Sequence, residues 1–424
     1  MRDRPGTRGI IPLMRDAARR FKAIKGKGQA SYQIKGKGQA FYQILLLPIV
    51  SASGSSPPMR KARWLAEWRK SAGKPVLYHV LSRVVDRRFV LGTEEKERFR
   101  TLMRMQEKFT GCRVLSYCLM DNHFHLLLEV PPMAEGGISD ALLLKRLSAL
   151  YGEDFVGGVA QELANARKAV YTSDTGLDEA VAAIHRRFTY RMHDLGEFMK
   201  GLLQRFTQWF NRTHSRTGRL WEDRFKSVIV EDGIAARTMS AYIDLNPVRA
   251  GMVEDPAEYR WSSYGEAVGG GKKGNGKKAR EGLVRAYFCD LGVGFEIEKW
   301  AEVSRLYRRL MGLALGRKPG KSESQRRSQT AAAVTKNTAE LLESEDNQTV
   351  LKDLGMAKML RCRIRYFTDG AVIGSREFVN EAFASARERF GPKRKDGARK
   401  LKGDNSAAAG GTLWSLRDLR KGIA

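Results

Sequence analysis

Met120-Asp-Asn-His-Phe-His-Leu-Leu-Leu-Glu129 is the stretch of sequence that decides the fold. Side chains alternate across a β-strand, so His123, His125 and Glu129 share one face while Phe124 lies with the aliphatic residues on the other. Two imidazoles two positions apart on a strand have bases about 7 Å apart, near enough to bind one divalent ion if a third ligand faces them. Two half-buried core histidines are the alternative interpretation of this pair.

The segments before this strand predict a mixed α and β structure. Strands are predicted over 76–84 and 113–120, and a helix is predicted between them over 93–109, where apolar residues recur at helical spacing. Asp121-Asn122 predicts a tight turn into the histidine strand. This β-α-β-β order begins a ferredoxin-like arrangement, which needs one more helix and one more strand.

The later sequence supplies the missing elements. An apolar helix face runs from Phe198 to Phe210, and a strand is predicted over 220–230. A further helix over 234–246, ended by Pro247, carries Tyr242. The fold class is therefore α+β, a ferredoxin-like β-α-β-β-α-β core with a helix appended to it. Residues 133–194 predict a helical insertion.

The composition favours a nucleic-acid partner. Lys and Arg total 76 of the 424 residues against 47 Asp and Glu, a formal charge of +29, which is typical of proteins that bind nucleic acid. No apolar run approaches the ~18 residues of a membrane-spanning helix. The four cysteines form no CxxC pair, so we expect neither a disulfide framework nor a cysteine-based zinc knuckle. We expect a cytoplasmic, nucleoid-associated location.

Both ends of the chain differ from the middle. Residues 1–58 hold two near-identical decapeptides at 25–34 and 35–44, too few for a solenoid. We expect a disordered basic segment, or upstream sequence with Met59 as the true start. A domain over 59–265 is followed by a predicted Gly/Lys linker, 266–280, and an accessory, basic and mainly helical region, 281–424.

Four blocks of the sequence, in this order, resemble the single-tyrosine HUH transposases, particularly the REP-associated tyrosine transposases and their insertion-sequence relatives. The resemblance extends from about residue 74 to residue 265. The blocks are Tyr78-His79-Val80 with Ser82-Arg83, the segment Cys118–Glu129, the segment Gly218–Phe225, and Tyr242–Gly251 followed by Trp261-Ser262-Ser263-Tyr264.

The resemblance implies that His123 and His125 bind a divalent metal and that Tyr242 is the nucleophile. A phenol with a pKa near 10 is a weak nucleophile at neutral pH, so cleavage would depend on an ion that polarises the phosphate. The family uses Mg²⁺ or Mn²⁺; two imidazoles favour manganese, and these ligand types also admit zinc. The alternative for Tyr242 is a packing residue on an amphipathic helix.

Other site residues have open alternatives. Asn246, one helical turn after Tyr242, holds a position where the family often has an amide metal ligand, although Asn before Pro is also a common helix stop. Glu129 is the competing ligand. We expect His79 to be an ordinary strand residue rather than a ligand. Basic and aromatic residues alternate around the presumed active face and are predicted to bind DNA: Arg219, Trp221, Arg224, Arg249 and Trp261. The alternative for Trp221 and Trp261 is a position in the core, which is the better interpretation for at least one of them.

The resemblance implies a transposase, a DNA strand transferase that cleaves and rejoins single-stranded or hairpin DNA through a 5′-phosphotyrosine intermediate. The partner would be DNA and not a membrane, and the protein a monomer or a homodimer that exchanges the tyrosine helix. One alternative is a domesticated DNA-binding protein with a vestigial or regulatory nuclease site. Another is a metal-dependent hydrolase that uses water as its nucleophile.

Overall fold

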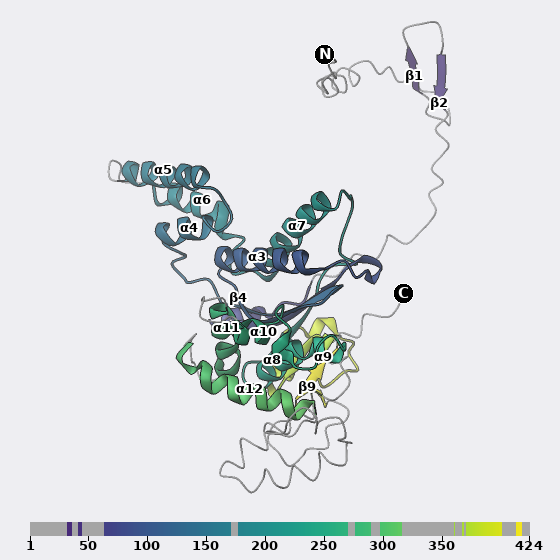
Figure 1. Ribbon diagram of the computed structural model, residues 1–424. Helices are drawn as coiled ribbons and strands as arrows, with labels where there is room; N and C mark the ends of the chain where they lie inside the picture. The colour runs from purple at the N-terminus through teal and green to yellow at the C-terminus, as the bar shows by residue number, and fades with distance from the viewer. Residues whose placement is uncertain are drawn as a thin grey trace, which may run out of the picture. The chain divides into compact units, whose positions relative to one another are not determined.

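The computed structural model describes residues 32–35, 41–44, 63–170, 177–269, 276–289, 297–315, 360, 367–368, 370–400 and 413–417. The chain divides into two units, residues 1–63 and 64–424 (Figure 1). In the first, β1 (Tyr32–Lys35) and β2 (Phe41–Ile44) pair as an antiparallel hairpin, within the segment predicted to be disordered. The rest of 1–58 lies outside the described residues.

A seven-stranded sheet in the order β4-β5-β3-β6-β7-β9-β8 forms the centre of the second unit. Its first four strands are β3 (Val76–Arg83), β4 (Arg113–Leu119), β5 (His123–Val130) and β6 (Lys226–Val230). β3 pairs antiparallel with both β5 and β6, and β4 pairs antiparallel with β5. With α3 (Thr93–Thr110) and α7 (Leu195–Thr213), this is the β-α-β-β-α-β order, so the predicted ferredoxin-like fold class is confirmed.

The alternation of side chains along these strands produces two cores, one on each face of the sheet. Phe124, Leu126 and Tyr78 pack in the core under α3 and α7, whereas Leu127 and Leu77 pack in the core on the opposite face. Figure 1 shows α3 and α7 on one side of the strands and the later helices on the other. Those later helices are α8 (Ile234–Asp244), α10 (Ser263–Gly269), α11 (Lys277–Phe288) and α12 (Trp300–Ala314).

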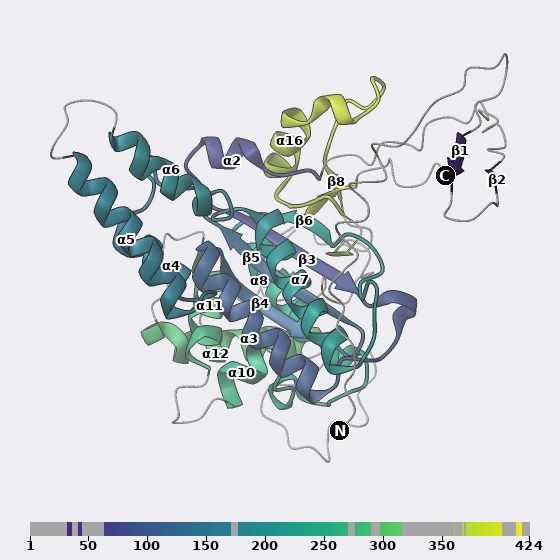
Figure 2. The ribbon, with the colours of Figure 1, turned by 90° about the horizontal axis from the view of Figure 1, so that it is seen from above.

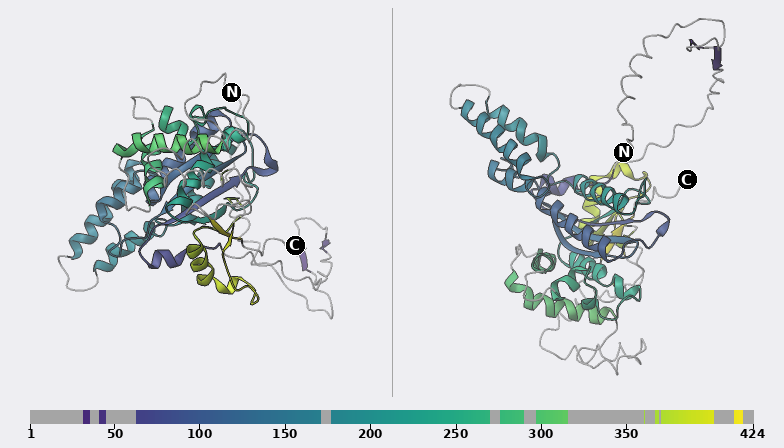
Figure 3. Two further views of the ribbon diagram at one scale, coloured as in Figure 1. Left: turned by 90° about the horizontal axis from the view of Figure 1, so that it is seen from below. Right: turned by 45° about the horizontal axis from the view of Figure 1, so that its top comes forward.

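Three helices lie between β5 and α7, in the region where the sequence predicts a helical insertion. They are α4 (Asp140–Leu147), α5 (Glu153–Val170) and α6 (Leu177–Thr189), and α5 and α6 project away from the sheet (Figures 2 and 3). They enclose a small core of their own, which includes Leu143, Leu147 and Val159.

The C-terminal region adds strands as well as the predicted helices. β7 (Val372–Gly374) pairs parallel with β6, β9 (Trp414–Leu416) pairs with β7, and β8 (Arg399–Lys400) pairs with β9. α16 (Arg376–Ser385) follows β7 and contacts α2 (Glu67–Ser71) through Trp68 and Phe378 (Figure 2). This region therefore extends the same sheet. Much of the predicted helical region 281–424 lies outside the described residues.

Two predicted boundaries are wrong. The strand predicted over 220–230 begins only at Lys226, because the chain before it bends and Trp221 forms an isolated bridge with Val84. The predicted linker 266–280 is helical at both ends, in α10 and α11, because Ala267 and Ala279 are buried in the core; residues 270–275 are outside the described part. The remaining short helices are α9 (Asn246–Arg249), η1 (Val85–Arg87), η2 (Pro256–Glu258), η4 (Ile297–Lys299) and η6 (Arg387–Arg389).

No helix in the parts of the chain that the structure describes is long and apolar enough to cross a bilayer.

Candidate active site

Three histidines meet on the face of the sheet that α8 covers. His123 and His125 lie on β5 with ring centroids 5.1 Å apart. On the neighbouring strand His79 pairs with Leu127, and Leu81 pairs with His125, so His79 is the diagonal neighbour of His125. Nε2 of His79 lies 3.0 Å from Nδ1 of His125, and both side chains are buried.

The hydrogen bonds of His79 determine the tautomer of His125. Nδ1 of His79 donates to the Phe367 carbonyl at 2.8 Å, because a carbonyl oxygen only accepts. In a neutral ring Nε2 is then an acceptor, so Nδ1 of His125 donates to it. Nε2 of His125 keeps its lone pair, which is the arrangement of a metal-binding histidine held by a neighbouring acceptor.

Asn122 has the same effect on His123. Its Nδ2 donates to the Arg87 carbonyl at 3.0 Å, which leaves its Oδ1 to accept from Nδ1 of His123 at 2.6 Å. Nε2 of His123 also keeps its lone pair. The two histidines predicted to bind the metal therefore fit a divalent ion, because each offers the same ring nitrogen.

The surroundings keep these rings neutral. Burial lowers the pKa of His79 to about 4. Burial first, and then the nearby Arg83 guanidinium, lowers the pKa of His123 to about 4. The pKa of His125 lies well below its usual value, mainly through burial and also through the two other imidazoles. Protons therefore do not compete for these nitrogens at neutral pH.

Tyr242 lies over the histidines from α8. Its ring centroid is 5.8 Å from that of His125 and 5.9 Å from that of His79, edge to face in both cases. The ring of Phe367 stacks on Tyr242 at 4.7 Å, and the Arg249 guanidinium lies 5.1 Å from the Tyr242 centroid. Tyr242 is only 1% exposed, so the described residues enclose the predicted nucleophile.

Asp244 fixes the position of α8. Its carboxylate accepts from the Tyr264 backbone N–H at 3.0 Å and from the Tyr307 hydroxyl at 2.7 Å, which joins α8 to α10 and α12. Burial raises the pKa of Asp244 to about 7, although these hydrogen bonds oppose the shift. The buried small residues Ala235, Ala236 and Ala241 let α8 approach the sheet, and Tyr242 faces the histidines as a result.

The two candidates for a third ligand, Asn246 and Glu129, differ in their hydrogen-bond partners and in their distance from the histidines. Nδ2 of Asn246 donates to the carbonyls of Tyr242 and Ile243 at 3.1 and 3.2 Å, which leaves Oδ1 as the ligand atom of the amide. Glu129 is fully buried and pairs with Arg285 at 2.7 Å and Arg113 at 3.3 Å. It lies four residues beyond His125 on β5, about 13 Å along the strand, so Glu129 is not part of this site.

The structure describes no group of three or more His, Cys, Asp and Glu side chains that could hold a metal ion. An amide ligand such as Asn246 is outside that set of residue types.

The residues predicted to bind DNA lie in different surroundings. Arg219 and Arg224 are exposed before β6. Arg249 instead faces the active site, where it donates to the Leu360 carbonyl at 2.7 Å. Trp261 is half-buried, with its indole N–H donating to Glu97 at 3.0 Å.

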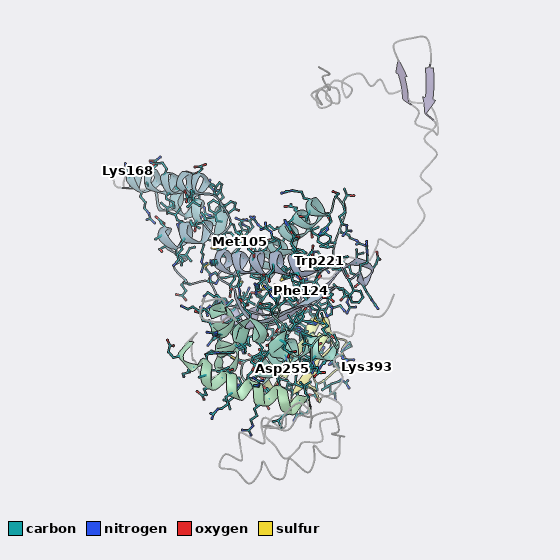
Figure 4. All side chains as sticks on the ribbon, in the orientation of Figure 1. Met105, Phe124, Lys168, Trp221, Asp255 and Lys393 are labelled. Atoms are coloured by element: carbon teal, nitrogen blue, oxygen red, sulfur yellow. The ribbon has the colours of Figure 1, made fainter. Side chains whose placement is uncertain are left out.

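The prediction that Trp221 stacks on DNA bases is contradicted by its position. Trp221 is a core residue, 5.4 Å from Phe124 and 5.8 Å from Phe206 between ring centroids, and its indole N–H donates to Thr207 (Figure 4). Strand alternation places Phe124 on the face opposite the histidines, so Trp221 lies under α3 and α7.

His79 and Phe367 contact the site although no pattern in the sequence near them indicates it. The pairing register of β3 with β5 could have indicated His79, because a diagonal position on the same face brings it to His125. No local pattern indicates Phe367, because local patterns do not reveal contacts between distant parts of the chain. Phe367 reaches the site by stacking on Tyr242, more than 120 positions earlier in the sequence.

One part of the chain matches a known protein family. Residues 74–140 match the family model described as "Transposase IS200 like", and no curated protein matches the chain. A solved structure of a REP-associated tyrosine transposase bound to a REP hairpin aligns at 13% identity with a TM-score of 0.29, covering 47% of this chain and 81% of that chain. The matched residues carry β3, α3, β4 and the histidine strand β5, so this segment of the chain is similar to IS200-like transposases.

Proposed function

We propose that this protein is a metal-dependent DNA strand transferase that cuts and rejoins single-stranded or hairpin DNA through Tyr242. One observation carries this proposal: the Tyr242 ring lies 5.8 Å from His125, and hydrogen bonds leave Nε2 free to bind a metal on both His123 and His125. A transposase family match over the histidine strand supports the same class of reaction.

His123 and His125 would hold Mg²⁺ or Mn²⁺ through their Nε2 atoms, with Oδ1 of Asn246 as a third ligand. Such an ion, when bound, polarises the scissile phosphate and stabilises charge on the leaving oxygen. His79 and Asn122 would keep the two imidazoles in the required tautomers.

Tyr242 would supply the nucleophile. Its Oη forms a bond to phosphorus as the bond from phosphorus to the 3′ oxygen breaks, the phenol loses a proton, and the 3′ oxygen gains one. The products are a 5′-phosphotyrosine link and a free 3′-hydroxyl, and attack by a 3′-hydroxyl on that link rejoins DNA. The Arg249 guanidinium, 5.1 Å from the ring centroid, would place a positive charge close to the tyrosine during this step.

The test is Tyr242→Phe, measured with a hairpin oligonucleotide and Mn²⁺. We expect the covalent protein–DNA adduct to disappear on a denaturing gel while DNA binding is unchanged. Tyr264→Phe is the matched control, because Tyr264 is also buried and its hydroxyl has no hydrogen-bond partner in the described structure; it should form adduct normally. Adduct formation by Tyr242→Phe would remove Tyr242 from the mechanism.

A second candidate is a DNA-binding protein in which the nuclease site is vestigial or regulatory. The enclosure of Tyr242 by Phe367 and Arg249 favours it, because DNA reaches the hydroxyl only if this cover moves. Tight binding by the wild-type protein with no cleavage of any hairpin in Mn²⁺ would support this candidate. Cleavage to a free 5′-phosphate without an adduct would instead indicate a hydrolase that uses water.

A further inference from the structure

The loop between β3 and α3 presents an unusually exposed aromatic side chain. Phe89 is 78% exposed, more than any other large apolar side chain in the described residues. Its neighbours Arg87 and Arg88 are exposed as well. An exposed phenyl ring next to two arginines in the sequence contributes little to the folding of the domain, since it buries almost no apolar surface.

Backbone hydrogen bonds hold this loop in place. The Val84 and Leu91 N–H groups donate to the carbonyls of Asn122 and Asp121 at 2.9 Å, and the Val85 N–H donates to the Leu220 carbonyl at 2.9 Å. Both ends of the loop are therefore fixed to the turn before the histidine strand.

Two consecutive residues of the loop have left-handed backbone angles. Asp86 and Arg87 have φ values of 57° and 56°, which are uncommon for residues other than glycine and cluster at binding sites. This turn directs Arg88 and Phe89 away from the core.

One side chain joins the loop to the candidate active site. Nδ2 of Asn122 donates to the Arg87 carbonyl at 3.0 Å, and Oδ1 of the same amide accepts from Nδ1 of His123 at 2.6 Å. Arg83, at the start of the loop, pairs directly with His123 across the sheet. The backbone of the loop is thus linked, through the Asn122 side chain, to the predicted metal ligand His123.

The charge of the loop suits a phosphate backbone. Arg83, Arg87 and Arg88 outnumber the single acidic residue of the loop, Asp86. Within the described parts of the chain neither Arg87 nor Arg88 forms an ion pair, whereas Arg100 and Arg104 on the following helix are both paired with glutamates. The charges of Arg87 and Arg88 are available to a ligand.

We propose that Phe89, Arg87 and Arg88 form a subsite for an unpaired nucleotide of single-stranded DNA next to the cleavage site. The Phe89 ring stacks on a base, and the two arginines bind the flanking phosphates, the combination that single-strand binding proteins use. This inference rests on the proposed function, because it places DNA at the histidine strand.

The test compares Phe89→Ala with the wild-type full chain for binding to a fluorescent single-stranded oligonucleotide and to the duplex of the same sequence. We expect single-strand affinity to fall about 10-fold or more, the effect of losing one base–aromatic stack, and duplex affinity to stay within twofold. Phe89→Trp should bind the single strand as the wild type does, with tryptophan fluorescence quenched by the stacked base. Folding is not at risk at so exposed a position.

Tyr190→Ala is the matched control, because Tyr190 is 63% exposed but lies in the helical insertion; it should leave both affinities unchanged. Equal single-strand affinity for Phe89→Ala and wild type, or equal losses for single strand and duplex, would overturn the proposal. The measurement is of binding alone, so adducts that survive Tyr242→Phe would end the tyrosine mechanism without affecting this result.

Discussion

At the scale of single residues, the buried histidines make folding sensitive to acid. The folded pKa of His79 and of His123 is about 4, below the ordinary 6.5, so the folded state binds fewer protons than the unfolded state between these values. Their contribution to stability is complete above pH 6.5 and is lost as the pH falls toward 4. His79, which is fully buried, should account for about 2 kcal/mol of loss between pH 7 and pH 5.

The measurement is the free energy of unfolding in urea at pH 7 and pH 5 for the wild type and for His79→Gln, which has no charged form but can still accept from His125. The variant should lose less stability on acidification. The same pH dependence in both proteins would mean that protonation of His79 is not the cause of the lost stability. The contribution of Asp244 to stability has the opposite dependence on pH. Its pKa is raised from 3.8 to about 7, so this contribution falls as the pH rises from 3.8 to 7.

The sequence indicated His123, His125 and Tyr242 because their signals are local. The two histidines share one face of a strand, and Tyr242 lies in one of the four blocks of sequence that resemble the transposases. The role of His79 can be inferred only from the pairing register of the strands, which depends on the place of β5 between β3 and β4 in the sheet. The burial of Trp221 depended on packing against α3 and α7, which composition near position 221 does not reveal.

At the scale of elements, the C-terminal region covers Tyr242 through Phe367. Phe367 precedes β7, and β7 is fixed to β6 by parallel pairing, so the stacked ring belongs to the sheet extension rather than to the ferredoxin-like core. We expect Phe367→Ala to raise the initial rate of adduct formation several-fold. The reason is that one aromatic stack of about 1 kcal/mol no longer opposes uncovering of the tyrosine, while the backbone carbonyl that orients His79 is retained.

Initial rates of adduct formation at saturating Mn²⁺ would check this prediction. Phe378→Ala on α16 is the matched control, since it removes a buried phenylalanine from the core on the other side of the sheet and should not raise the rate. A slower or unchanged rate for Phe367→Ala would mean that Phe367 is only a packing residue.

The predictability of elements followed their length and periodicity. The long helices α3 and α7 and the strands β3 and β5 have strong patterns, and the sequence predicted each of them. β7, β8 and β9 are two or three residues long, too short for alternation to appear, and their pairing with β6 is a contact between distant parts of the chain. The glycine and lysine content near 270 suggested a linker, although buried Tyr264 and Leu283 fix the helices on both sides of it.

At the scale of the whole molecule, the net charge of +29 should make binding to DNA strongly dependent on salt. Each phosphate that the protein neutralises releases condensed counterions, so affinity falls by about 1000-fold between 50 and 200 mM salt for roughly six phosphate contacts. The slope of log affinity against log salt concentration therefore counts the contacts. Net charge alone indicates the class of partner and not the residues that bind it.

Single substitutions can assign that slope to residues. Arg219→Gln and Arg224→Gln, at exposed positions before β6, should each reduce the slope by about 1 if they contact phosphates. Trp221→Phe should leave it unchanged, because the indole is enclosed by Phe99, Phe124 and Phe206 and only the hydrogen bond to Thr207 is lost. Titration of a labelled hairpin at four salt concentrations gives each slope. A wild-type slope near zero would contradict phosphate binding by the basic surface, and unchanged slopes for both arginine variants would move the contacts elsewhere on the chain.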